Sequence, residues 1–164
     1  MRTHLLATVV TLASLTITIG AKAADPILGT WKLNIAESKF SPILQAFTKQ
    51  GPPREHTETY REVEGNQIEF TAKEIRADGS PTLFRYVVPL QGGTVKILEG
   101  GIEGLSYVEA IIDSDWHVIA LRDGKQIGLR RKTVSKDGKT MLQTVTATDP
   151  QGRRIEQSEV YDRQ

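Results

Sequence analysis

The sequence predicts an all-β protein: a single up-and-down antiparallel β-barrel of about 8 to 10 strands, with a short helix after the first strand. Three observations predict it. Apolar and polar residues alternate over many short runs, which is the two-residue period of a strand with one buried face. Glycine, asparagine and aspartate residues typical of tight turns separate these runs. The turns recur about every 10 to 15 residues, which suits hairpins rather than crossover helices.

The first strand is expected at Gly29-Thr30-Trp31-Lys32-Leu33, where Trp31 and Leu33 alternate with polar neighbours. The predicted strands span residues 30–34, 56–64, 67–76, 82–90, 94–98, 106–113, 116–122, 126–134, 140–148 and 153–161. This is more than most twisted open sheets hold, so we expect closure into a barrel, because closure removes exposed edges. A two-sheet sandwich is the alternative, and turn spacing alone does not separate the two.

One short helix is predicted over residues 42–49. Ser41 supplies an N-cap, Pro42 occupies the first helical position, and a Gly-Pro-Pro run ends the element. Apolar residues recur at helical spacing within it. That apolar face needs a partner, which the open end of a barrel would provide.

Residues 1–23 have the pattern of a secretory signal peptide: basic Arg2, a long uncharged run, and Ala21-Lys22-Ala23 as an A-x-A cleavage site. Cleavage after Ala23 would leave residues 24–164 as one domain. A transmembrane anchor is the alternative reading of the uncharged run, but threonines dilute it. We therefore expect a periplasmic or secreted monomer with no membrane span in the mature chain.

The composition excludes several classes of function. The chain has 21 basic and 20 acidic residues, and the leader contains two of the bases and no acid, so the mature protein would be close to neutral. Interspersed charges of both signs argue against a nucleic-acid partner. There is no cysteine, which excludes disulfides, thiolate chemistry and thiolate metal sites. A small exported domain without disulfides depends on its core and suits a bacterial envelope.

The predicted strands differ in their inner faces. Residues 68–72 and 84–88 alternate cleanly, with apolar side chains on one face. Residues 56–62 and 157–161 instead have polar groups on both faces. A barrel interior that accepts hydroxyls and charges is expected to be partly hydrated, which favours a lined cavity over a dry sandwich core.

At both ends of the mature chain the sequence resembles a known superfamily. Gly29-Thr30-Trp31-Lys32-Leu33 resembles the opening G-x-W strand of the calycins, the lipocalins and fatty-acid-binding proteins. Asp137-Gly138-Lys139 and the ending Val160-Tyr161-Asp162-Arg163-Gln164 look like their penultimate hairpin and final strand. G-T-W-K-L-N, S-K-F-S-P and V-S-K-D-G-K-T-M are together similar to small exported bacterial lipocalin-like proteins of unknown function. The resemblance implies a barrel that binds a small amphipathic or hydrophobic ligand.

Fatty-acid binders hold a carboxylate with an Arg-x-Tyr pair in the last strand. The resemblance places Tyr161 on the tyrosine position and Glu159 on the arginine position, where an acid would repel a carboxylate. Arg130 or Arg131 matches a further arginine of the family, depending on register. The residues expected to line the cavity, as hydrogen-bonding and stacking groups, are Tyr161, Tyr86, Trp116 and Arg131.

No cofactor, catalytic residue or metal site is predicted, and a binding protein is favoured over an enzyme. Asp113-Ser114-Asp115-Trp116-His117 offers carboxylates and an imidazole as ligands, but its spacing matches no known metal loop and Asp-Ser-Asp is common in turns. His56 and His117 have the chemistry of a base or a haem ligand, but spacing ties no carboxylate to either. The alternative function is a cell-envelope interaction or structural module with a filled barrel and no ligand.

Overall fold

The computed structural model describes residues 25–43, 45, 51–149 and 151–164, so the predicted signal peptide lies outside the described residues. The described residues form eleven strands in one antiparallel sheet. The strands are β1 (Gly29–Lys39), β2 (Glu55–Val63), β3 (Gln67–Ile75), β4 (Pro81–Pro89), β5 (Gly92–Thr94), β6 (Lys96–Glu99), β7 (Leu105–Ile112), β8 (Asp115–Arg122), β9 (Lys125–Val134), β10 (Thr140–Thr148) and β11 (Arg154–Arg163).

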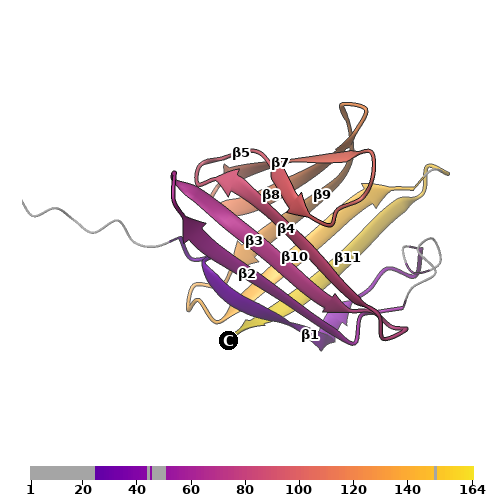
Figure 1. Ribbon diagram of the computed structural model, residues 1–164. Helices are drawn as coiled ribbons and strands as arrows, with labels where there is room; N and C mark the ends of the chain where they lie inside the picture. The colour runs from indigo at the N-terminus through magenta and orange to yellow at the C-terminus, as the bar shows by residue number, and fades with distance from the viewer. Residues whose placement is uncertain (1–24, 44, 46–50, 150) are drawn as a thin grey trace, which may run out of the picture.

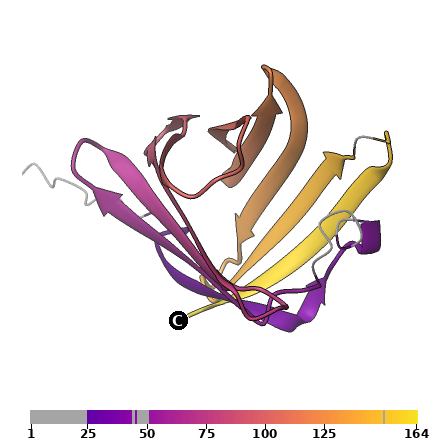
Figure 2. The same cartoon turned by 45° about the vertical axis from the view of Figure 1, so that its right-hand side comes forward.

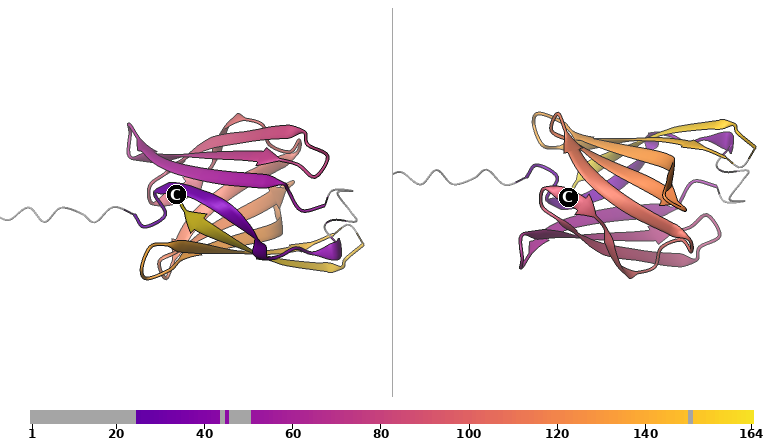
Figure 3. Two further views of the ribbon diagram at one scale, coloured as in Figure 1. Left: turned by 90° about the horizontal axis from the view of Figure 1, so that it is seen from below. Right: turned by 90° about the horizontal axis from the view of Figure 1, so that it is seen from above.

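The sheet curls into a nearly closed barrel (Figures 1 and 2) with the strand order β5-β7-β8-β9-β10-β11-β1-β2-β3-β4-β6. The first strand pairs with the last, since Trp31 lies opposite Arg163 and Leu33 opposite Tyr161. Seen from below and from above, one continuous sheet surrounds the interior (Figure 3). The predicted antiparallel barrel is therefore confirmed over the sandwich.

The strand count is higher than predicted because the expected strand over residues 94–98 divides between two partners. β5 pairs with β7, whereas β6 pairs with β4. Between them, the Val95 N–H donates to the Tyr107 carbonyl at 3.0 Å, so the segment bridges the two edges of the sheet. Gly92 permits this close approach: its φ is 86°, and a Cβ there would lie 2.6 Å from the Glu109 carbonyl oxygen.

The segment after the first strand also differs from the prediction. β1 extends to Lys39 through an irregular stretch after Asn34 rather than ending at that residue. Most of the predicted helix lies outside the described residues. One helical hydrogen bond is described, from the Gln45 N–H to the Ser41 carbonyl at 3.1 Å, so the helix is not confirmed. Among the described residues there is no helix of the length and apolar character that a membrane crossing requires.

The hydrophobic core fills the end of the barrel where β1 begins and β11 ends. Trp31 is fully buried there, as predicted. Its indole Nε1–H donates to the Ile27 carbonyl at 2.8 Å, and the Arg163 guanidinium stacks on its ring at 4.1 Å. The buried side chains of this core are Ile27, Trp31, Leu33, Tyr60, Ile68, Phe70, Tyr86, Val88, Val95, Trp116, Met141 and Tyr161. Ile27, which precedes β1, is itself buried and belongs to this core.

Candidate functional site

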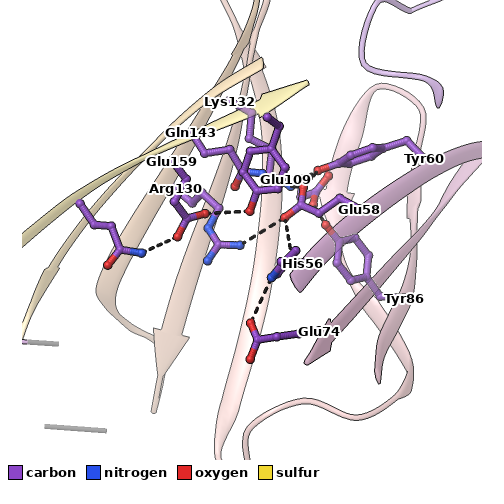
Figure 4. A network of polar contacts seen from close by, with 12 residues as sticks. His56, Glu58, Tyr60, Glu74, Tyr86, Glu109, Arg130, Lys132, Gln143 and Glu159 are labelled. Carbon is purple, nitrogen blue, oxygen red and sulfur yellow. Dashed lines mark hydrogen bonds and ion pairs between the residues drawn. The ribbon is translucent and has the colours of Figure 1, made fainter. Parts of the chain in front are cut away.

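Next to the core, the barrel interior contains a connected group of polar side chains, the inner polar cluster (Figure 4). Strand alternation puts these residues inside, because every second residue of a strand faces the interior. Its members are His56, Glu58, Tyr60, Glu74, Tyr86, Glu109, Arg130, Lys132, Gln143 and Glu159. Polar groups therefore extend across the barrel from β2 to β9, β10 and β11.

Glu58 is the centre of the cluster and is fully buried. Its Oε2 accepts hydrogen bonds from the Tyr60 hydroxyl and from Gln143 Nε2, the latter at 2.7 Å. Lys132, also buried, lies with its Nζ 3.8 Å from the same oxygen and donates to the Tyr60 hydroxyl at 2.6 Å. A buried carboxylate is thus held by one ammonium, one phenol and one amide.

The second oxygen of Glu58 faces two further bases. Glu58 Oε1 lies 3.6 Å from His56 Nε2 and 3.8 Å from Arg130 Nη1. Burial alone would raise the pKa of Glu58, but the charges of Lys132, His56 and Arg130 outweigh it and hold that pKa well below its ordinary value. The Glu58 carboxylate is therefore ionised at neutral pH.

His56 lies between two carboxylates. Its Nδ1 is 3.0 Å from Glu74 Oε2, on the neighbouring strand β3. Burial alone would lower the pKa of His56, but Glu58 and Glu74 outweigh burial and raise it from 6.5 to about 9. The imidazole is therefore a cation at neutral pH, with a proton on each nitrogen.

This charge state predicts a pH dependence of stability. Because the folded pKa of His56 is raised from 6.5 to about 9, the imidazolium contributes stability in full below pH 6.5 and loses it as the pH rises to about 9. We expect His56→Gln to destabilise the protein most near pH 6 and much less near pH 9.5. Urea unfolding of both proteins across this range checks it, and a difference that stays constant with pH would contradict the assignment.

Two more carboxylates of the cluster are bonded to tyrosines. Tyr86 donates its hydroxyl to Glu109 Oε1, and burial raises the pKa of the Glu109 carboxyl. Tyr161 donates to Glu159 Oε2 at 2.9 Å, while the Gln157 amide donates to the other oxygen of that carboxylate. The acid at the position of the family's arginine is thus held inside the barrel by its own neighbours.

Aromatic side chains form a part of the interior that adjoins the polar cluster. Phe70 stacks on Tyr86 with ring centres 4.5 Å apart, and Phe84 lies 5.4 Å from Tyr86 and 5.8 Å from Tyr107. We call Phe70, Phe84, Tyr86 and Tyr107 the aromatic wall. Lys132 Nζ lies 4.7 Å from the Phe70 ring centre, which joins the wall to the inner polar cluster. Phe84 and Tyr107 are only partly buried.

Small side chains line the inner face at the end of the barrel away from the core. Gly128 of β9 lies opposite Ala120 of β8 and opposite Ala147 of β10. A Cβ at Gly128 would be 3.5 Å from the Ala147 Cβ and 3.8 Å from the Ala120 Cβ, so the three positions share a face. A pocket of about 330 Å³ is lined in part by Gly128 and Ala147. The residues that line this pocket include no member of the inner polar cluster; they are Gln126, Ile127, Gly128, Thr146, Ala147, Thr148 and Arg154.

Of the four residues predicted to line a cavity, Tyr161, Tyr86 and Trp116 face the interior of the barrel, whereas Arg131 does not. Tyr161 and Tyr86 donate hydrogen bonds to carboxylates of the interior. Trp116 lies in the hydrophobic core, with its Nε1 3.3 Å from Asp25 Oδ1. Arg131 lies on the outer face, more than half exposed, and donates to Asp115 Oδ2 at 2.6 Å. A ligand contact by these four residues stays a prediction.

The inward arginine is Arg130, the other residue that the resemblance allowed. Sequence reasoning missed Glu58, Lys132 and Gln143 as its neighbours. A signal for Glu58 was present: it follows His56 by two positions, so strand alternation puts both on one face. Arg130, Lys132 and Gln143 reach this pair from β9 and β10, which spacing along the chain does not reveal.

The cluster at Asp113 to His117 forms a hairpin turn, as its composition indicated. Asp113 and Ser114 have φ angles of 51° and 72°, which are typical of a tight turn between β7 and β8. Trp116 faces inward and is 4% exposed. Among the described residues, acids, histidines and cysteines form no group of three or more that would hold a metal ion.

An up-and-down barrel whose G-x-W first strand pairs with its last strand defines a calycin-like fold. Solved structures agree: a fatty-acid-binding protein from Echinococcus granulosus superposes with a TM-score of 0.60 at 10% identity, covering 85% of this chain and 98% of that one. The fluorescent protein UnaG gives 0.58 at 15% identity, covering 84% and 96%. Zebrafish ileal bile acid-binding protein with cholic acid gives 0.55 at 11% identity, covering 85% and 99%. No family model and no curated protein matches the sequence.

Proposed function

We propose that this chain is an exported protein that binds a small amphipathic or hydrophobic molecule inside its barrel. One observation carries the proposal: the interior is itself amphipathic, because the inner polar cluster around Glu58 adjoins the aromatic wall, with Tyr86 a member of both. A protein that needed only a filled core would gain little from placing so many charges there, because buried ion pairs seldom stabilise more than apolar packing does.

Three further points support it. Phe84 and Tyr107 of the aromatic wall stay partly exposed, and small residues face the same interior at Gly128 and Ala147. Two of the structural neighbours are named for binding fatty acids and bile acids, and they share this fold. Export is proposed from residues 1–23 and places the protein in the periplasm or outside the cell.

Binding of the neutral dye N-phenyl-1-naphthylamine tests the proposal. We expect its fluorescence to rise with the protein, and native mass spectrometry to show one bound molecule per chain. Ala147→Trp fills the interior beside Gly128 and should weaken binding at least about tenfold. Leu142→Trp is the control, because that residue is on the same strand, faces outward and is 43% exposed.

The alternative, an envelope interaction module with a filled barrel, is favoured by an exposed apolar group on β6 and the loop after it. Ile97, Leu98 and Ile102 are 36%, 45% and 60% exposed. If the dye binds Ala147→Trp as well as the wild type, and binding is lost in Leu98→Ser with Ile102→Ser, this outer surface is the apolar site and the ligand-in-barrel proposal fails.

A further inference from the structure

Three polar atoms of the inner polar cluster have no hydrogen-bond partner among the described residues: His56 Nε2, Glu58 Oε1 and Gln143 Oε1. Glu58 and Gln143 are fully buried, and the His56 side chain is 15% exposed. Buried polar atoms in folded proteins are nearly always hydrogen-bonded. Three such atoms in one cluster therefore indicate a position where a polar group from another molecule would be stabilised.

Geometry explains why these atoms do not satisfy one another. His56 Nε2 and Arg130 Nη1 lie 3.6 Å and 3.8 Å from Glu58 Oε1, which is within reach of charge attraction but too long for a hydrogen bond. Gln143 is held in place because its Nε2 already donates to Glu58 Oε2 at 2.7 Å. An oxygen atom to one side of His56 Nε2 and Glu58 Oε1, about 2.8 Å from each atom, would accept from the imidazolium Nε2–H and donate its own proton to the carboxylate.

The charges around this position decide which polar group of a ligand fits there. The carboxylates of the cluster are Glu58, Glu74, Glu109 and Glu159, and its bases are His56, Arg130 and Lys132. Glu58 Oε1 borders the proposed position, so an added carboxylate would be repelled there. An ammonium would meet the His56, Arg130 and Lys132 cations that already surround Glu58. A neutral hydroxyl both accepts and donates, and it adds no charge.

We propose that the inner polar cluster holds the hydroxyl group of an amphipathic alcohol beside His56 Nε2 and Glu58 Oε1, hydrogen-bonded to both, with the apolar part of that alcohol along the aromatic wall. This inference rests on the proposed function and names the class of ligand. It separates this chain from binders of lipid carboxylates, because Glu58 and Glu159 supply acids inside the barrel.

Three eight-carbon probes, octan-1-ol, octanoate and octylammonium, test it, with binding followed by nitrogen-15 NMR of the purified protein. We expect octan-1-ol to bind about tenfold tighter than either ion, since its hydroxyl gains hydrogen bonds to charged partners. Equal or tighter binding of octanoate or octylammonium overturns the hydroxyl inference and leaves the proposed function standing. Equal binding of all three is also the result expected if only water satisfies these atoms. If none of the three probes binds and the naphthylamine dye does not bind either, both the hydroxyl inference and the proposed function are wrong.

Glu58→Gln takes one negative charge from the cluster, so the preference for octan-1-ol over octanoate should fall about tenfold. Because this variant disturbs a buried ion network, His56→Leu provides a second test: it removes the Nε2–H donor and should weaken the binding of octan-1-ol about tenfold. Glu69→Gln is the control, since Glu69 pairs with Arg61 and Arg85 on the outer face. An unchanged preference in Glu58→Gln together with unchanged octan-1-ol binding in His56→Leu would overturn the inference.

Discussion

Trp31→Ala is expected to lower the free energy of unfolding by about 3 to 5 kcal/mol, the range for large core aromatics reduced to alanine. Trp31 is fully buried. The substitution removes the hydrogen bond to the Ile27 carbonyl and the surface on which Arg163 stacks. Trp31 lies opposite Arg163 where the first strand pairs with the last. The substitution is therefore expected to weaken the pairing of β1 with β11.

Guanidinium unfolding followed by circular dichroism measures this loss. Leu142→Ala is the control, since this side chain is 43% exposed on the outer face, and it should cost about 0.5 kcal/mol or less. Trp31→Phe should fall between the two. An unfolding midpoint of Trp31→Ala equal to that of the wild type would mean that Trp31 is not part of the core.

Lys132→Met is expected to destabilise the protein by about 3 to 5 kcal/mol, because removal of one partner leaves buried charge uncompensated. The Lys132 side chain is 2% exposed; its Nζ lies 3.8 Å from Glu58 and donates to the Tyr60 hydroxyl at 2.6 Å. Burial lowers the pKa of Lys132, but Glu58 and Glu109 oppose that effect. Chemical unfolding of the variant at pH 7 measures the change.

The adjacent residue gives a matched control. Arg131 faces outward, is 55% exposed and pairs with Asp115, so Arg131→Met should cost about 1 kcal/mol or less. The double variant Lys132→Met with Glu58→Gln should be less destabilised than the sum of the two single variants, since the charges interact. Equal losses in Lys132→Met and Arg131→Met would contradict the buried ion network.

The architecture was largely predictable because it depends on local patterns. Alternation around Trp31 and the turn residues between runs each act within a few positions, and the closing contact of the first and last strands followed from barrel closure. The division of residues 92–99 into β5 and β6 was not predictable. It depends on where two distant strands, β4 and β7, separate in space, and the sequence around Val95 has no local signal for this.

The candidate site was predictable only in outline. Polar inner faces on residues 56–62 and 157–161 indicated a hydrated interior, and those strands supply Glu58 and Glu159 to the cluster. The choice between Arg130 and Arg131 depended on register, because a shift of one residue exchanges the inner and outer faces of a strand. Lys132 and Gln143 reach Glu58 from β9 and β10, contacts that exist only after the barrel closes.

A crystal structure of the protein grown with octan-1-ol would show whether an alcohol binds inside the barrel beside Glu58. We predict one molecule inside the barrel, with its alkyl chain against Phe84 and Tyr107 and its hydroxyl oxygen within hydrogen-bond distance of Glu58 Oε1. An alcohol bound only on the outer surface near Leu98 and Ile102, with side chains or water alone around Glu58, would contradict it.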